Sequence, residues 1–483
     1  MRNCITMLAA LLAGQTMAAQ AVKEFTMQQF IDSAKNKSLL ARVNKTQKEV
    51  AFYQYLSFNS TLKPQILFYG NIPSYSNDYF DVLQPDGTIK FLQRRQNFSN
   101  AGFSLTQQIA ATGGQVSLNS NISRFDDFSN KVKLYNGTPV YFNLTQPIFG
   151  FNELKWGKKI EPLKLEEANR KYIQEMENIG QQIAAAYFDV LEAQNGIESS
   201  KTNYENSVHN YTIEKERINL GTTTEARLLQ LELISLKSKQ EQEKSKFNYQ
   251  IALLNLKSQA GLFSDGDLKL TAPDSIPNLL LDINNIIQYA RESRPEYIGF
   301  KRKKLESQRD INQAASQRKQ INLIATVGYN NTGNEVRNVY ENMRDQQRFS
   351  IGFNIPLVDW GRYTARVKTA EATEKLIDYN NELQEQTMVQ QIISLVRNIQ
   401  LLKSNIALAV ETNSVARRRF EFSNQLFELG KLSITELSIA QTEKDQARRD
   451  YLAALREFWN AYFMLRVATL YDVEKGTPLT ANY

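Results

Sequence analysis

The chain has 483 residues and a formal net charge of +7, with 42% hydrophobic and 23% charged residues. These proportions are ordinary for a folded protein, and the length allows several domains. Lys and Arg are interspersed with Asp and Glu along the predicted helices, which is typical of solvated helical faces. Because the basic residues do not form a separate patch, nucleic acid is not the expected partner.

Residues 1–21 are predicted to be a secretory signal peptide. Arg2 supplies a basic start, residues 5–14 an apolar core, and Ala-Gln-Ala at 19–21 a cleavage site. The single cysteine, Cys4, lies in this segment, so we expect neither a disulfide nor a thiol nucleophile in the mature chain. No later run of about 18 apolar residues occurs, so no membrane-spanning helix is expected. These features are compatible with two classes of protein, a soluble periplasmic protein and an outer-membrane barrel.

The two halves of the chain repeat each other. An offset of 209 residues carries Pro147 onto Pro356 (356 − 147 = 209). Near the start of each half the offset is 256 residues, which pairs Ile31 with Ile287 (287 − 31 = 256). The first half therefore contains an insertion of 47 residues (256 − 209 = 47) at about residues 64–147. This self-similarity predicts a tandem duplication.

In each half, an opening helix precedes a β segment. The opening helices are expected at 22–63 and 281–320, and the β segments at 64–147 and 321–356. Apolar residues at every second position predict strands with one apolar and one polar face. Thr-Gly-Gly at 112–114 is a turn signal, so the first half is expected to contain an extra hairpin. The expected strands are 65–70, 102–108, 115–122, 140–146, 323–329 and 349–355.

Residues 148–261 and 357–472 are each predicted to form a long helical hairpin, because proline and glycine are nearly absent from both. The tips are expected near Gly221 and Gly430. At both places Leu-Gly is followed by Thr or Ser, and a glycine commonly ends one helix where a hydroxyl side chain caps the next. The apolar stripes on these helices are narrow, which predicts a single layer of packed helices with both faces exposed to water.

The remaining segments show no sign of catalytic chemistry. Residues 262–280, rich in Gly, Asp and Pro, are predicted to be a linker, and residues 473–483 an irregular C-terminal tail. The one histidine, His209, lies in a polar helical context that is typical of a surface residue. No zinc site or histidine-based triad can be assembled, so we expect no metal, no cofactor and no enzymatic activity.

Two motifs carry a resemblance to a known family. Pro-Leu-Val-Asp-Trp-Gly at 356–361 is similar to the strand-to-helix junction of the outer-membrane efflux protein (TolC) family, and Leu-Gly-Lys-Leu-Ser-Ile-Thr-Glu-Leu at 429–437 is similar to its hairpin tip. The first-half junction at 147–157 keeps the Pro and the Trp-Gly but is five residues longer (9 − 4 = 5 between Pro and Trp). With the extra hairpin, it resembles the branch found in Bacteroidetes-type bacteria.

The resemblance implies an α+β membrane protein that forms a homotrimer. The strands of the copies would pool into one outer-membrane β-barrel, and the tandem-duplicated helical hairpins would form a periplasmic α-barrel. Such a protein exports small molecules or secreted proteins passively, as the exit duct of a tripartite efflux or type I secretion system. Its expected partners are outer-membrane lipid, a periplasmic adaptor (membrane fusion) protein and an inner-membrane pump or ABC transporter.

The resemblance also suggests functional residues. Acidic residues narrow the tunnel mouth in the family, and the matching position here is Glu436, whose repeat equivalent is Arg227 (436 − 209 = 227). We hypothesise that these two residues pair between hairpins and hold the mouth shut. A second family acid would fall at Ile439, where this sequence departs from the pattern. The expected docking residues for an adaptor are Leu220, Gly221, Thr224, Leu429, Gly430 and Ser433. The expected lipid-facing residues are Phe103, Leu105, Phe142, Leu144, Phe349, Ile351, Phe353 and Ile355.

The main alternative is a secreted trimeric fibrous coiled coil, such as an adhesin stalk or a needle. It explains the long helices and a trimer but not the proline-bounded β segment that recurs at the same place in each half. An enzyme is the third alternative, and the lack of a catalytic constellation disfavours it.

Overall fold

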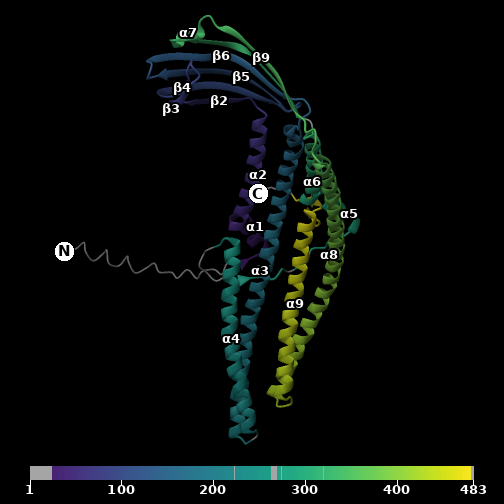
Figure 1. Ribbon diagram of the computed structural model, residues 1–483. Helices are drawn as coiled ribbons and strands as arrows, with labels where there is room; N and C mark the ends of the chain where they lie inside the picture. Colours follow the sequence, from purple (N-terminus) through teal and green to yellow (C-terminus); the bar gives the residue numbers. More distant parts are fainter. Residues whose placement is uncertain (1–23, 222, 263–268, 274, 319, 480–483) are drawn as a thin grey trace, which may run out of the picture. The chain divides into compact units, whose positions relative to one another are not determined.

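The computed structural model describes residues 24–221, 223–262, 269–273, 275–318 and 320–479 (Figure 1). The signal peptide predicted at residues 1–21 lies outside these residues. Among the helices of the described ranges, none is long and apolar enough to cross a bilayer.

The chain divides into two compact units. The first, here called the hairpin unit, consists of residues up to 46, residues 171–294 and residues from 388 onward. The second, here called the sheet unit, consists of residues 47–170 and 295–387.

The long helices form two hairpins, as their duplication predicts. α3 (Glu153–Asn219) and α4 (Glu225–Ala260) make the first, and α8 (Arg362–Glu428) and α9 (Ile434–Thr469) make the second (Figure 1). α3 and α8 have 67 residues each, and α4 and α9 have 36 each. The two halves are thus equal in helix length, and each longer helix extends about 100 Å at 1.5 Å per residue.

Each opening helix, predicted as one element, is two helices. α1 (Met27–Lys37) and α2 (Leu39–Thr61) are separated by Ser38, and α5 (Ile283–Ser293) and α6 (Pro295–Ser316) by Arg294. Both separating residues have extended backbones, with ψ of 152° and 141°. Arg294 precedes Pro295, whose ring disfavours helical geometry in the residue before it. At Ser38 the hydroxyl instead accepts a hydrogen bond from the N–H of Ala41 (3.1 Å), in the first turn of α2.

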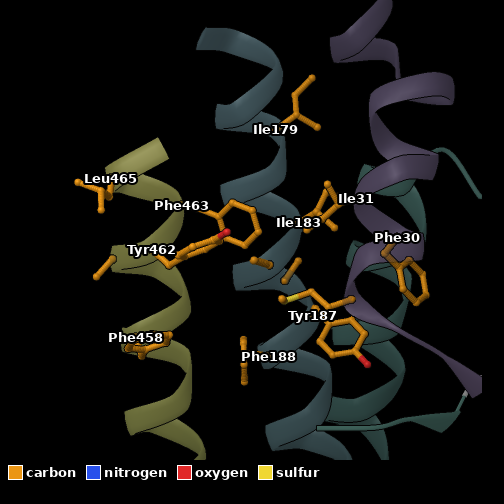
Figure 2. Close-up of a cluster of buried hydrophobic side chains, with 14 of the residues drawn as sticks. Phe30, Ile31, Ile179, Ile183, Tyr187, Phe188, Phe458, Tyr462, Phe463 and Leu465 are labelled. Carbon is orange, nitrogen blue, oxygen red and sulfur yellow. The ribbon is translucent and has the colours of Figure 1, made fainter. Parts of the chain in front are cut away.

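The core of the hairpin unit brings α1, α3 and α9 together (Figure 2). The ring of Phe30 packs edge to face against that of Tyr187, with centroids 5.9 Å apart. Gly180 of α3 faces the same core, because a Cβ built there would be in ordinary van der Waals contact with the ring of Phe463 (3.5 Å) and with Ile31 (3.6 Å). Apolar side chains from three separate segments therefore share one core, which contributes the main favourable term to the folding of this unit.

Short strands pair the segments predicted to be irregular with the ends of neighbouring elements. β1 (Glu24–Phe25) pairs in parallel with β7 (Lys269–Leu270), inside the predicted linker. β10 (Tyr471–Asp472) pairs with β11 (Thr477–Pro478) in the tail, and the ring of Tyr471 stacks on that of Tyr289 in α5 at 3.9 Å. The tail therefore packs against the hairpin unit rather than extending from it.

The sheet unit contains one antiparallel sheet in the order β2-β4-β5-β6-β8-β9, with β3 also paired to β4. The ends of the path, β2 and β9, have no further strand partner in the described chain. The strands are β2 (Gln65–Asn71), β3 (Tyr75–Leu83), β4 (Ile89–Ile109), β5 (Gly114–Asp127), β6 (Val132–Pro147), β8 (Gln320–Gly333) and β9 (Arg344–Asn354).

The first-half β segment has more strand than predicted. β3 was not expected, and β4 begins at Ile89 rather than near residue 102. The two strands meet at a turn in which the N–H of Gln84 donates to the carbonyl of Thr88 (2.7 Å) and Asp86 accepts from the N–H and hydroxyl of Thr88. Gly87 has a φ of +83°, which favours glycine. The Pro-Asp-Gly at 85–87 was a turn signal that the prediction overlooked.

A short helix, also not predicted, connects β8 and β9. α7 (Val336–Tyr340) packs on the sheet through Val339, which is fully buried. Gly137 of β6 makes room for it, because a Cβ there would come within 2.6 Å of Val339 Cγ1.

Candidate functional site

The sheet has one face made largely of apolar side chains. Leu118 of β5 lies opposite Leu105 of β4 and opposite Phe142 of β6. Phe142 in turn lies opposite Val327 of β8. Directly opposed residues of antiparallel strands share a face, so these side chains form a row across four strands. The predicted lipid-facing residues that the register places on this face are Phe103, Leu105, Phe142, Leu144, Phe349, Ile351 and Phe353.

These apolar side chains are exposed within one chain. Phe353 is 75% exposed and Phe349 68%. Ile355, the remaining predicted residue, follows Asn354, at which β9 ends, so it is not part of the sheet. An exposed apolar surface of this extent indicates contact with lipid or protein.

The opposite face of the sheet carries amides and hydroxyl groups that bind one another. Asn119 of β5 accepts a hydrogen bond from the hydroxyl of Ser104 (2.5 Å) and donates one to Ser117 (2.8 Å). The hydroxyl of Thr326 in β8 donates to Asn143 in β6 (3.0 Å). Hydrogen bonds within and between strands therefore satisfy the neutral polar side chains of this face.

Both helical hairpins turn at a glycine. Gly221 and Gly430 have φ of +70° and +71°, a left-handed conformation that commonly ends helices. At the second tip the N–H of Lys431 donates to the carbonyl of Leu426 and that of Gly430 to the carbonyl of Phe427, both at 2.9 Å. The last carbonyls of α8 are thus satisfied within the turn.

The residues that follow the two glycines differ. Ser433 caps α9: its hydroxyl accepts from the N–H of Glu436 (3.2 Å), and its own N–H donates to the Glu436 carboxylate (3.1 Å). This backbone N–H and the Ser433 hydroxyl together hold the pKa of Glu436 below its ordinary value. At the first tip, Thr224 precedes α4 but makes no capping hydrogen bond with its side chain. The tips are alike in backbone and different in side-chain chemistry.

A buried carboxylate, Glu214, organises the first tip. Its side chain is 1% exposed and forms ion pairs with Arg217 (3.1 Å) and Arg227 (3.0 Å). The hydroxyl of Thr223 also donates to it. The Nε of Arg227 is close to Glu214 but has no hydrogen-bond partner, so this contact is an ion pair without hydrogen-bond alignment. The sequence prediction missed Glu214, which lies seven residues before Gly221.

The two tips also contact each other. Leu231 of α4 packs with Phe427, Ile434 and Leu437 of the second hairpin, and all four are buried. The guanidinium of Arg217 lies over the Phe427 ring, 5.9 Å from its centroid. A small apolar cluster and one cation–π contact therefore join the hairpins.

The predicted pair between Arg227 and Glu436 does not form within one chain. Within one chain each has a partner in its own hairpin, Glu214 for Arg227 and Ser433 for Glu436. A carboxylate three residues after a serine cap is held locally, and a buried carboxylate attracts the nearest cations. The two residues occupy equivalent positions in the repeat, and within one chain they do not contact each other.

The prediction also missed a buried charge cluster in the hairpin unit. Glu177 of α3 is 2% exposed and binds Lys35 of α1 (2.5 Å) and Arg466 of α9 (2.7 Å). Arg466 also binds Asp472 of β10 (2.7 Å). Burial acts to raise the pKa of Glu177, but Lys35 and Arg466 outweigh it, so the pKa lies below its ordinary value. No pattern in the sequence pairs these residues, which lie on separate segments.

Two helices of the hairpin unit carry apolar side chains that are exposed. On α8 the residues follow a period of seven, and on α4 they follow spacings of three and four within two groups. Such stripes are the seams along which helices pair. The α8 residues are Leu401, Leu408, Val415 and Phe422, and the α4 residues are Leu229, Leu233, Leu236, Phe247, Ile251 and Leu254.

Comparisons with known proteins identify a matching family model and solved structures with a similar fold. A family model described as outer membrane efflux protein matches residues 300–469. No curated protein sequence matches the chain. The CmeC outer membrane channel of Campylobacter jejuni is similar in structure, with 13% identity and a TM-score of 0.65 over 94% of this chain and 87% of that one.

Two further solved structures share the fold. The MtrE outer membrane channel of Neisseria gonorrhoeae, solved in its open state, is 12% identical with a TM-score of 0.64, over 95% of this chain and 91% of that one. The outer membrane protein VceC of Vibrio cholerae is 11% identical with a TM-score of 0.62, over 94% of this chain and 96% of that one. At such identities the likeness establishes the fold, and it confirms the α+β arrangement with duplicated hairpins.

The family match, which covers residues 300–469, adds to the likeness in fold. Members of the matched family are outer-membrane channels and not enzymes, which favours a channel over the secreted stalk. The branch resemblance, resting on the long first-half junction and the extra hairpin, stays a prediction. Residues 300–469 match the outer membrane efflux protein family and the whole chain shares the fold of solved outer-membrane channels, which together indicate a location in the outer membrane with an extension into the periplasm.

Proposed function

We propose that the chain is one copy of a homotrimeric duct through which solutes cross the outer membrane passively. The observation that carries the proposal is the antiparallel sheet, which has an apolar face, a polar face and two unpaired ends at β2 and β9. Unpaired strand edges are not tolerated in lipid, because their backbone groups cannot bond to water. Pooling the sheets of three copies into a closed barrel would remove the edges and surround a lumen with the polar faces.

The exposed stripes of α4 and α8 support assembly from several copies. Leu233 on α4 is 52% exposed and Leu408 on α8 is 61% exposed, although both lie at seam positions. If α4 of one copy packs against α8 of the next, both stripes are buried and the hairpins form a continuous wall. This wall would be the periplasmic tunnel.

The tips would form the mouth of this tunnel. Glu214, with Arg217 and Arg227, holds the first tip in place, and the contact of Arg217 with Phe427 holds the second against it. We infer that this cluster, rather than an Arg227–Glu436 pair, keeps the mouth narrow. A periplasmic adaptor would dock at the tip residues, and an inner-membrane pump or ABC transporter would supply the energy for efflux or type I secretion.

Conductance tests both parts of the proposal. The full-length protein, purified from outer membranes in detergent, should run as a trimer by native mass spectrometry and give stepwise currents in planar bilayers. Glu214→Gln should raise the conductance, because two arginines lose their shared carboxylate. The matched control is Glu216→Gln, an exposed residue two positions away on the same helix.

The outcomes separate the two claims. A monomer that gives no current would contradict the duct itself. A conducting trimer in which Glu214→Gln matches wild type would contradict only the role of the tip cluster.

A further inference from the structure

The polar face of the sheet carries two arginines on its edge strand. Arg348 of β9 lies opposite Thr326 of β8, and Arg344 lies opposite Asn330. Residues two apart in a strand share a face, so Arg344 and Arg348 are on the same side with Gln346 between them. Both arginines are exposed.

The row that contains Arg348 can be followed across the sheet. Each residue lies opposite the next, and Arg348 is the only ionised member of this row. The row runs Arg348, Thr326, Asn143, Ser117, Thr106 and Gln65. The charge of Arg348 therefore has no counterpart on any strand of its row.

The neighbouring row, which lies between the two arginines, is also neutral. It runs Gln346, Gly328, Tyr141, Asn119, Ser104 and Leu67. The hydroxyls and amides of these rows bind one another, as Ser104 with Asn119 and Thr326 with Asn143 show. A hydrogen-bonded network of neutral groups does not neutralise the positive charges of Arg344 and Arg348.

No ion pair joins either guanidinium to a carboxylate in the part of the chain that the structure describes. Arg337 provides a contrast, since it lies on α7 and pairs with Glu341 at 2.5 Å. At the opposite edge of the sheet, the polar side of β2 carries Gln65, Leu67 and Tyr69 and no acid, whereas Asp78 of β3 lies opposite Arg94 of β4. A neighbouring copy paired through β2 would therefore leave the arginines uncompensated.

From this charge pattern we infer that the sheet-lined part of the conduit favours anionic solutes, and that Arg344 and Arg348 determine this preference. The inference rests on the proposed function, because it needs the polar face to line a lumen. Three copies would then place a ring of guanidinium groups in the path of the cargo. Rings of basic side chains select anions in pores, and the effect is largest when the pore radius is comparable to the Debye length, about 10 Å at 0.1 M salt.

Reversal potentials of the full-length trimer in planar bilayers test this inference. Across a gradient of dilute KCl, wild type should be more permeable to chloride than to potassium. The double variant R344Q/R348Q should lower the chloride-to-potassium permeability ratio by at least about twofold, since the ring loses its charge. R344K/R348K should keep the wild-type ratio, which separates charge from packing.

The control is R337Q, which removes an arginine from α7 and should leave the ratio unchanged. A ratio in R344Q/R348Q equal to that of wild type would overturn the inference while the duct itself stands. If no variant conducts at all, the proposed function fails, and this inference fails with it.

Discussion

Glu177 shows what a single residue does for the hairpin unit. It lies in α3 and pairs with Lys35 in α1 and with Arg466 in α9, so one carboxylate holds three segments that are distant in sequence. Its side chain is 2% exposed, so water screens these pairs little. Removing one partner of a buried pair leaves an uncompensated charge, which costs more than the pair contributed.

Replacing Glu177 with glutamine should lower the free energy of unfolding by about 3–5 kcal/mol, because Lys35 and Arg466 would lose this carboxylate while buried, and Arg466 would keep only its contact with Asp472 among its ion pairs. Thermal unfolding of the detergent-solubilised protein, followed by circular dichroism at neutral pH, measures the loss. Glu241→Gln is the control, since Glu241 is 61% exposed and lies 3.7 Å from Lys244. A variant at position 177 as stable as the control would show that the cluster contributes little.

The same residue predicts a pH dependence. The pKa of Glu177 is lowered on folding, so its contribution is fully present above its ordinary value of 4.5 and is lost as the pH falls through the folded value. Wild type should therefore lose stability below about pH 4.5, and Glu177→Gln should lack this part of the loss. Melting temperatures measured between neutral and acidic pH test this, and parallel profiles for the two proteins would contradict it.

At the scale of elements, the two hairpin tips show how a duplicated structure diverges. Both turn at a left-handed glycine, and both continue into a helix of 36 residues. Ser433 and Glu436 then form a capping box, whereas Thr224 has no capping bond and Arg227 pairs with Glu214. The glycine makes the left-handed turn in both halves, whereas the residues that flank it form different contacts in the two tips.

Ser433→Ala should weaken the first turn of α9 by about 1 kcal/mol, because it removes the side-chain half of the capping box. The matched substitution Thr224→Ala should have little effect on α4, because this threonine makes no capping bond. Hydrogen exchange of the backbone amides in the two first turns measures both effects, with faster exchange expected at Glu436 alone. Equal changes at the two tips would contradict the difference between the caps.

The whole molecule depends on which face of the sheet meets lipid. Phe353 is on the apolar face and Asn354 follows it on the polar face, so adjacent residues provide a test of orientation. Phe353→Arg should reduce the yield of heat-resistant trimers in the outer membrane, because an arginine on the lipid face of a barrel strand is destabilising, by about 2–4 kcal/mol at the bilayer midplane and by less toward the strand ends. Asn354→Arg should assemble nearly as well as wild type. Equal yields from the two variants would show that the apolar face does not contact lipid.

The sequence alone determined the features that depend on local interactions. Glycine and a following hydroxyl residue mark each tip because they satisfy the end of one helix and the start of the next within a few residues. Alternation in Phe349, Ile351 and Phe353 reveals two-faced strands because side chains in a strand alternate. The duplication and the family resemblance follow from these patterns together, and the family match over residues 300–469 and the shared fold confirm the resemblance.

Only the tertiary structure decided which residues meet. The partners of Arg227 and of Glu177 are chosen by packing between segments, and no local pattern encodes a contact between Lys35, Glu177 and Arg466. The uncompensated charge of Arg348 became visible only when the strand register showed a neutral row across the sheet. Secondary structure is set by short-range bonds, whereas ion pairs and the two faces of a sheet depend on burial and register, which arise only when the chain is folded.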